Sequence, residues 1–216
     1  MDFAAARRNM VDGQVRTNKV TDEAVVDALR QVPREVFVPE PLRGIAFVDE
    51  DLPLAGDRYL VEPMVFARLV QAATIRPTDI ALDLGCGPGY STAVIARLAN
   101  TVVALESDRA LLDQAARNLG QLGVDNAIMV AGPLEQGWPA QAPYNVIVLG
   151  GAVAHIPNHI IDQIADGGRL VGVVAGEGVG RAVMLLRRGE SVSSRTLFDA
   201  TIPLLPGFAP EPTFVF

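Results

Sequence analysis

A glycine-rich segment that begins with an acid carries the clearest chemical signal in the sequence. Residues 83–90 read Asp-Leu-Gly-Cys-Gly-Pro-Gly-Tyr; they follow the apolar run 80–82 and lead into a helical pattern. A strand that turns through glycines into a helix presents backbone N–H groups to a ligand that side chains would otherwise block. Twenty-one positions after Gly85, the apolar run 102–105 ends in Glu106. An acid at the tip of the second strand binds ribose hydroxyls in such folds, so the pattern predicts a nucleoside ligand.

The glycine spacing indicates which nucleoside cofactor fits. A dinucleotide site needs a small residue at the sixth motif position, where this chain has Tyr90, and the third glycine comes one residue early, at Gly89. The pattern acid-x-Gly-x-Gly-x-Gly resembles the first motif of class I methyltransferases, which bind S-adenosylmethionine. Asp83 would then lie near the ammonium group of that cofactor. We interpret Cys86 as a small residue that fits the loop and not as a nucleophile; a glycine-rich turn without a ligand is the alternative.

Composition and charge exclude several other classes of protein. The chain has 216 residues, of which 50% are hydrophobic, and a formal net charge of −7. Because no basic cluster exceeds two residues, we expect no nucleic-acid partner. The first 16 residues contain repeated charges and no apolar run approaches the roughly 20 residues of a membrane span, so we expect no leader, no membrane association and a cytoplasmic location. No metal is expected.

The order of the apolar patterns predicts a single α/β domain over residues 1–216. Residues 1–75 form an N-terminal cap, with helices over about 1–20 and from a cap at Thr21 to Pro33, then proline-rich short strands and turns, then a helix that begins at Pro63. Residues 76–216 form the cofactor-binding core, with a mostly parallel sheet and an antiparallel edge. Its predicted strands are 80–84, 101–106, 127–130, 145–150, 168–175, 181–187 and a weaker one near 192–198; its predicted helices are 90–99, 108–122 and 156–165.

Segments outside the glycine loop resemble the protein-L-isoaspartate O-methyltransferase family. The resemblance runs from about residue 9 to residue 206, and the segment Val-Pro-Arg-Glu-Val-Phe-Val-Pro at 32–39 is its most specific part. Further matching segments are 10–16, 46–49, 52–54, 62–63, 137–139, 142–145, 156–157 and 167–171.

The resemblance implies a Rossmann-like class I methyltransferase fold with a seven-stranded sheet, a helical N-terminal cap and a usually monomeric chain. It implies S-adenosylmethionine as cofactor and the free carboxylate of isoaspartyl residues in damaged proteins as methyl acceptor. It also implies a set of cofactor-binding residues, namely Leu60, Asp83, Gly85, Cys86, Gly87, Pro88, Gly89, Tyr90, Glu106, Ser107, Pro133 and Leu134.

Two departures from the family pattern bear on the chemistry. Where the family has Gly-Gln-Thr-Ile-Ser-Gln-Pro, this chain has Val61 at the serine position and Tyr59 at the threonine position, so no catalytic residue is assigned. A valine cannot donate a hydrogen bond, whereas Arg58 could supply a charge-assisted donor to a carboxylate. In the adenine loop, the family's Gly-Asp-Gly becomes Gly132-Pro133-Leu134, which removes an acceptor for the adenine amino group.

The acceptor decides how much catalysis the protein must provide. A carboxylate is already ionised at neutral pH and needs alignment and desolvation but no general base. An amine or phenol acceptor would need a base, for which His155, after the fourth strand, and His159 are the candidates. The predicted acceptor-side residues are therefore Arg58, Tyr59, Val61 and His155. The alternatives are a methyltransferase with another protein or small-molecule acceptor, and a weakly active cofactor-binding protein. The aromatic residues Phe208, Phe214 and Phe216 are predicted to form an apolar tail.

Overall fold

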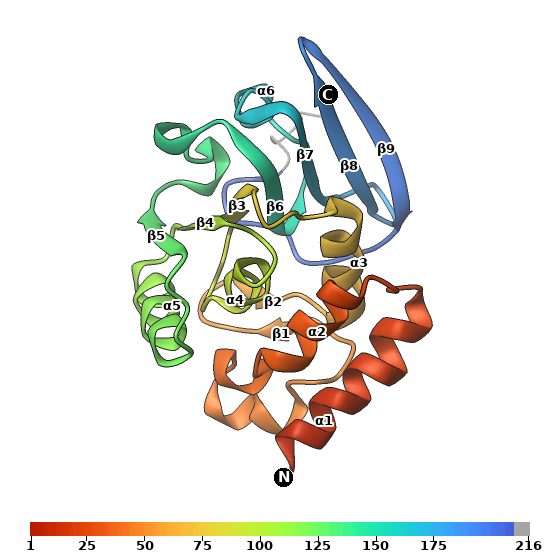
Figure 1. Ribbon diagram of the computed structural model, residues 1–216, viewed down its shortest axis with the longest axis vertical. Coiled ribbons are helices and arrows are strands. Elements are labelled where there is room, and N and C mark those ends of the chain that lie inside the picture. The colour runs from red at the N-terminus through yellow and green to blue at the C-terminus, as the bar shows by residue number, and fades with distance from the viewer. Residues whose placement is uncertain (210–216) are drawn as a thin grey trace, which may run out of the picture.

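The computed structural model describes residues 1–209, and within these residues seven strands form one sheet in the order β5-β4-β3-β6-β7-β8-β9 (Figure 1). The strands are β3 (Ile80–Leu84), β4 (Thr101–Glu106), β5 (Ala127–Ala131), β6 (Tyr144–Val153), β7 (Ile164–Val174), β8 (Arg181–Arg188) and β9 (Ser191–Asp199). β5, β4, β3, β6 and β7 pair in parallel, and β8 and β9 add an antiparallel edge. The predicted fold class is confirmed, including the strand near residues 192–198.

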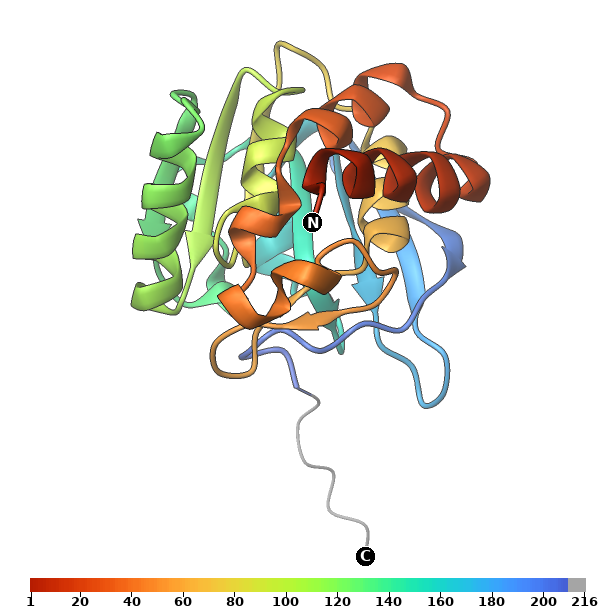
Figure 2. The ribbon, with the colours of Figure 1, turned by 90° about the horizontal axis from the view of Figure 1, so that it is seen from below.

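The helices cover the two faces of the sheet unequally (Figures 1 and 2). α3 (Pro63–Ala73), α4 (Tyr90–Ala96) and α5 (Arg109–Gln121) lie on one face, and α6 (Asn158–Ile161) lies on the other with the single turns η5 (Leu134–Gln136) and η6 (Pro139–Gln141). Successive side chains of β3 point to opposite faces of the sheet, so this strand contributes to the core on both faces. Ala81 packs in the cluster under α3, whereas Leu82 and Leu84 pack in the opposite cluster.

The N-terminal cap stacks over α3 and α4 (Figure 2). It contains α1 (Phe3–Met10), η1 (Val11–Val15), η2 (Arg16–Asn18), α2 (Glu23–Gln31), η3 (Arg34–Phe37), η4 (Glu40–Ile45) and the two-residue strands β1 (Leu52–Pro53) and β2 (Tyr59–Leu60). Its apolar residues share one buried cluster with Tyr90, Ala93 and Val94 of α4. The cap is therefore packed directly on the helix that follows the glycine loop.

Three sequence predictions about helices are wrong in detail. The first helix is α-helical only over Phe3–Met10, and η1 and η2 continue it to Asn18 with other helical hydrogen-bond spacings; near its end the side chains of Thr17 and Asn18 bond the carbonyls of Gly13 and Gln14. The cap of α2 is Asp22, whose carboxylate accepts from two backbone N–H groups, and not Thr21. The helix predicted over 156–165 is the single turn α6, because the carbonyl of Gln163 already accepts the N–H of Tyr144 in the sheet.

The segment after β9 crosses the carboxyl end of β6. Ala152 donates to Pro203 O and Leu205 donates to Ala152 O at 2.9 and 2.8 Å, and Ala154 donates to Phe208 O at 3.0 Å. Leu205 and Phe208 are buried, so one of the three predicted tail aromatics belongs to the core. The other two, Phe214 and Phe216, lie outside the described residues.

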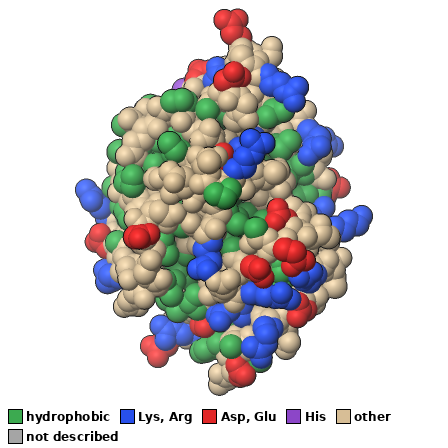
Figure 3. Space-filling view, viewed as in Figure 1, with side chains coloured by type: hydrophobic (Ala, Val, Ile, Leu, Met, Phe, Trp, Pro, Cys, Tyr) green, Lys and Arg blue, Asp and Glu red, His purple; other side chains and the backbone are tan. Residues whose placement is uncertain are grey.

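The described part of the chain contains no helix long and apolar enough to cross a membrane. On the face shown in Figure 3, acidic and basic side chains are interspersed and no continuous basic surface is seen.

Candidate functional site

The glycine loop joins β3 to α4 at the carboxyl edge of the sheet. Gly85, Gly87 and Gly89 have φ angles of 84°, 53° and 98°, a region that residues with a Cβ rarely adopt. The amides of Gly85 and Cys86 both donate to Leu105 O, at 2.9 and 3.1 Å, which ties the loop to β4. A Cβ on Gly89 would lie 3.2 Å from the Cβ of Ala115, so this glycine also lets the start of α4 approach α5. The sequence thus requires glycine here for both the turn and the packing.

Glu106 ends β4 beside this loop and is fully buried. Its Oε2 accepts the N–H of Gly87 at 2.8 Å, and its Oε1 accepts the N–H groups of Ser107 and Asp108 at 2.8 and 3.2 Å. Because β3 and β4 are parallel neighbours, their carboxyl ends meet at one edge. The structure therefore brings Glu106 and the glycine loop together, and Ser107 beside them.

Arg58 also reaches this carboxylate, from the turn between β1 and β2. Its Nη2 and Nε lie 3.1 and 3.3 Å from Glu106 Oε2, and Nη2 donates to Gly85 O at 2.6 Å. Only 4% of Arg58 is exposed. The sequence predicted that Arg58 faces the methyl acceptor. Its side chain instead lies against the glycine loop and forms an ion pair with Glu106, 48 positions further along the chain.

Asp83, at the end of β3, is a second fully buried carboxylate. Its Oδ2 accepts the hydroxyls of Ser91 and Thr92 at 2.7 and 2.6 Å, while within the described residues its Oδ1 has no hydrogen-bond partner. Burial raises the pKa of Asp83 to about 6, against the lowering effect of the two hydroxyls. Burial also raises the pKa of the nearby Cys86 thiol well above its ordinary value, so a neutral thiol sits in the loop.

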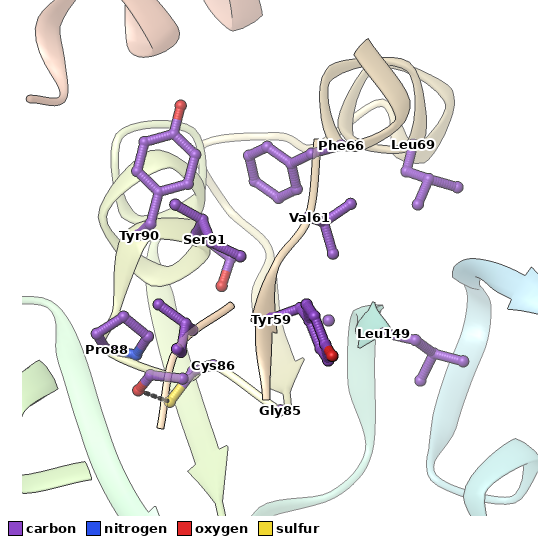
Figure 4. A pocket seen from close by; sticks show the side chains of 14 residues that line it. Tyr59, Val61, Phe66, Leu69, Gly85, Cys86, Pro88, Tyr90, Ser91 and Leu149 are labelled. Atoms are coloured by element: carbon purple, nitrogen blue, oxygen red, sulfur yellow. Dashed lines mark hydrogen bonds between the residues drawn. The ribbon is translucent and has the colours of Figure 1, made fainter. Parts of the chain in front are cut away.

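A small cavity of about 30 Å³ opens beside the glycine loop (Figure 4). Its lining contains eight of the predicted residues, namely Tyr59, Leu60, Val61, Gly85, Cys86, Gly87, Pro88 and Tyr90. The remaining lining residues are Leu54, Phe66, Leu69, Ser91, Leu149 and Gly150. Of these, Leu149 and Gly150 could have been found from the sequence, because they stand at the carboxyl end of the strand next to β3. Side chains also crowd Gly85 outside the cavity: a Cβ on this residue would lie 2.9 Å from both Arg58 Nη2 and Leu205 Cδ2.

The cap segment that resembles the family pattern holds the acceptor side of this cavity in place. Arg34 is fully buried, donates from Nη2 to Val61 O at 2.8 Å and from Nε to Ala46 O at 2.7 Å, and stacks over the Tyr90 ring at 4.8 Å. The Tyr90 hydroxyl points away from the cavity (Figure 4). Arg34 therefore connects the backbone beside the cavity to the first residue of α4.

Three acidic residues of the cap and Glu62 surround the start of α3. Asp51 accepts the N–H of Glu62 at 3.0 Å, and Asp49 accepts the N–H of Met64 at 2.9 Å. These bonds satisfy donors that the first helical turn leaves free. Burial and the nearby carboxylates, including Glu50, raise the pKa of Glu62 to about 7.

Four predicted residues lie away from both the small cavity and the glycine loop. Leu134 is fully buried in the cluster on the opposite sheet face, and Pro133 precedes it. His155 is exposed and lines a separate hollow of about 830 Å³ that Glu177 and residues of β8 and β9 also line. His159 bonds the carbonyl of Glu135 at 2.6 Å. The structure thus separates both histidines from the glycine loop.

Comparison with known proteins gives one consistent result. The family model "Protein-L-isoaspartate(D-aspartate) O-methyltransferase" matches residues 5–201. A protein-L-isoaspartate O-methyltransferase of Rhodopseudomonas palustris is 37% identical over 97% of this chain and 89% of its own length, and one of Roseiflexus castenholzii is 36% identical over 97% and 96%.

Solved structures share the fold. A protein-L-isoaspartate O-methyltransferase superposes with a TM-score of 0.81 and 24% identity over 93% of this chain and 66% of that one. A putative member from Plasmodium falciparum, solved in complex with S-adenosyl-L-homocysteine, gives a TM-score of 0.78 with 18% identity over 92% of this chain and 97% of that one.

Proposed function

Because the chain belongs to the protein-L-isoaspartate(D-aspartate) O-methyltransferase family, we propose that it is an S-adenosylmethionine-dependent carboxyl O-methyltransferase acting on isoaspartyl residues of proteins or peptides. The observation that carries the proposal is the match over residues 5–201, which includes the glycine loop and Glu106. A related structure holds S-adenosyl-L-homocysteine, the product that such a reaction leaves.

The donors and acceptors at the loop fit such a cofactor in kind. Glu106 would accept the ribose hydroxyls, and the amides of the glycine loop would face the methionine end. The buried Oδ1 of Asp83 has no partner within the described residues and would offer an acceptor on the ammonium side. When bound, the cofactor supplies a methyl group on a sulfonium. Ser107, Leu60, Pro133 and Leu134 remain predicted contacts.

Methyl transfer to a carboxylate requires no proton transfer by the side chains of the protein. An aspartyl-type carboxylate with a pKa near 4 is ionised at neutral pH, so the protein must orient it and exclude water. Tyr59 lines the cavity and is 37% exposed, so its hydroxyl would donate a hydrogen bond to the acceptor, while Val61 and Leu149 provide an apolar wall. We assign these residues positioning roles and no general base.

A different acceptor is the second candidate, and the cavity lining favours it. Within the part of the chain that the structure describes, the lining includes no charged side chain, and Arg58 is committed to Glu106. A methyltransferase that selects a less charged acceptor, on a small molecule or another protein side chain, fits such a wall. We further propose a monomeric enzyme, as the resemblance to the family implies, and a cytoplasmic one, since its single cysteine is a buried free thiol.

The test uses labelled S-adenosylmethionine with two peptides that differ only in carrying isoaspartate or aspartate. We expect base-labile label, released as methanol, on the isoaspartyl peptide alone. Label on neither peptide, together with label on other cell components, would support the second candidate. Label on nothing, by a folded protein, would contradict the proposed function.

A further inference from the structure

We infer that Arg58 is a latch on the cofactor cleft. It holds the carboxylate that the ribose hydroxyls would use, and it must leave Glu106 before a nucleoside cofactor can bind. This inference rests on the proposed function, because it assumes that the glycine loop and Glu106 form the cofactor site. It assigns to Arg58 control of cofactor affinity, a role different from contacting the acceptor.

The hydrogen bonds at Glu106 show why the latch excludes the ribose. Both oxygens of this carboxylate already accept protein donors: Oε2 from Gly87 and Arg58, and Oε1 from Ser107 and Asp108. The backbone donors belong to the loops that shape the site. Two side chains also donate: the Ser107 hydroxyl to Oε1 at 3.3 Å, and Arg58 to Oε2 with two nitrogen atoms. Arg58 is the charged one and comes from outside the loops of the site, so it is the donor that a pair of ribose hydroxyls would replace.

The space at the loop supports the same conclusion. Arg58 Nη2 lies 2.9 Å from the position that a Cβ on Gly85 would take, and the cavity on the other side of the loop is only about 30 Å³. Sites for small ligands and cofactors measure about 300–1,000 Å³. A nucleoside cofactor therefore needs space beyond this cavity, and withdrawal of the Arg58 side chain frees the region next to Glu106, a residue that does not line the cavity.

The turn that carries Arg58 has few contacts of its own. β1 and β2 pair through two residues each, the turn residues Ala55, Gly56 and Asp57 are exposed, and Leu54 donates to Arg58 O at 2.8 Å. A two-stranded ribbon of this length is weak without side-chain anchors. The guanidinium, bonded to both Glu106 and Gly85 O, is the polar anchor between this hairpin and the sheet. When it leaves Glu106, the exposed turn loses this anchor and can shift, while the buried Leu52 and Leu60 keep the two strands in the cap cluster.

The decisive variant is Arg58→Gln, which installs the residue type that the resembling family pattern has at this position. We expect it to bind S-adenosyl-L-homocysteine at least tenfold more tightly than the wild type by titration calorimetry, because no ion pair has to be broken. Hydrogen exchange of the Leu54 and Gly87 amides in the free protein is expected to speed up. The matched control is Arg169→Gln, which removes the arginine of another buried ion pair, to Asp79, and should leave the affinity unchanged.

A kinetic measurement on the wild type keeps the test independent of how the variant folds. If the latch must open first, the observed rate of S-adenosyl-L-homocysteine binding should level off as its concentration rises. A rate that rises linearly, or an affinity that is equal or lower in Arg58→Gln, would overturn the latch and leave the proposed function intact. Failure of both folded proteins to bind S-adenosyl-L-homocysteine would overturn the latch and the proposed cofactor site together.

Discussion

Two buried arginine–carboxylate pairs lie at opposite ends of the parallel strands, one at the amino end and one at the carboxyl end. They differ in the elements that they join. Arg169, in β7, pairs with Asp79, directly before β3, at 2.6 Å, and also donates to the carbonyls of Ala73 and Thr74 at the end of α3. Arg58 pairs with Glu106 at 3.1 Å from a two-residue hairpin. The first pair fixes regular elements to each other, whereas the second holds a short movable segment over the glycine loop.

Burial alone therefore does not identify the role of an ion pair. Both arginines are nearly inaccessible, yet the surroundings of their carboxylates differ. Asp79 accepts one further backbone N–H, from Arg76, whereas Glu106 accepts three, from Gly87, Ser107 and Asp108. A buried carboxylate with other donors can lose its arginine at a lower cost than one without them. The Arg58–Glu106 pair at the carboxyl end of the strands is therefore suited to opening, whereas the Arg169–Asp79 pair at their amino end is suited to holding the fold together.

The largest expected effect is on stability and falls on the amino edge. Arg169→Gln should lower the free energy of unfolding by about 3–5 kcal/mol, because it strands Asp79 as a buried charge. Arg58→Gln should lower it by only about 1–3 kcal/mol, the cost typical of losing hydrogen bonds to a charged group. Urea denaturation of the two variants measures both values. Equal losses would remove the distinction between a structural pair and a latch.

The next effect concerns the carboxylates themselves. Glu106→Ala, made in the Arg58→Gln protein so that the ion pair is absent before and after the change, should weaken S-adenosyl-L-homocysteine binding at least tenfold, about 1.4 kcal/mol, because the ribose hydroxyls lose their acceptor. Asp79→Ala in the same protein is the matched control: it should reduce stability and leave the affinity of the folded protein unchanged. Calorimetry that finds the same affinity in Arg58→Gln with and without Glu106→Ala would refute the ribose assignment.

A smaller effect is expected on the acceptor side. Val61→Ser restores the hydroxyl of the family pattern beside the cavity and should raise the rate on an isoaspartyl peptide severalfold, if the lost donor limits that activity. Val192→Ser, an exposed change on β9, serves as the control. An unchanged or lower rate in Val61→Ser would indicate that Tyr59 has redefined the acceptor, which favours the second candidate function.

The smallest expected effect is a pH dependence of stability that comes from two carboxyl groups near the glycine loop and the cavity. The pKa values of Asp83 and Glu62 are raised in the folded state, to about 6 and about 7, so the folded protein holds more protons than the unfolded chain between pH 4.5 and 7. The stability that these groups contribute is therefore fully present below their unfolded pKa values and is lost as the pH rises through the folded ones.

Glu62→Gln isolates one of these groups. Its melting temperature, relative to the wild type, should be higher at pH 8 than at pH 5, because the variant never acquires the charge beside Asp49, Glu50 and Asp51. Glu190→Gln, in the exposed β8–β9 turn, should show no such difference. A melting-temperature difference that is the same at both pH values would contradict the proposed titration of Glu62.

The sequence predicted the parts of the fold that depend on local pattern. The sheet strands and the glycine loop were found because continuous apolar runs and glycine turns have few alternative structures. The short α6 was missed because a sheet bond to Gln163 overrides helical spacing. The change of helix type after Met10 was not predicted either, because the apolar spacing is helical on both sides of it.

The direction of Arg58 could not be predicted from sequence. Its neighbours in the chain, Tyr59 and Val61, do line the cavity, so the expectation for Arg58 was reasonable. The side chain instead follows a partner 48 positions away, which no local pattern reports. The position of Leu205 could not be predicted either, because this residue reaches Gly85 only through the path of the segment after β9.

A crystal structure of the protein with S-adenosyl-L-homocysteine tests the central claim most directly. We expect the ribose hydroxyls to bond to Glu106, the Arg58 guanidinium to have moved away from both Glu106 and Gly85 O, and the turn between β1 and β2 to have shifted with it. A complex in which Arg58 still pairs with Glu106 while the ligand is bound elsewhere would contradict it.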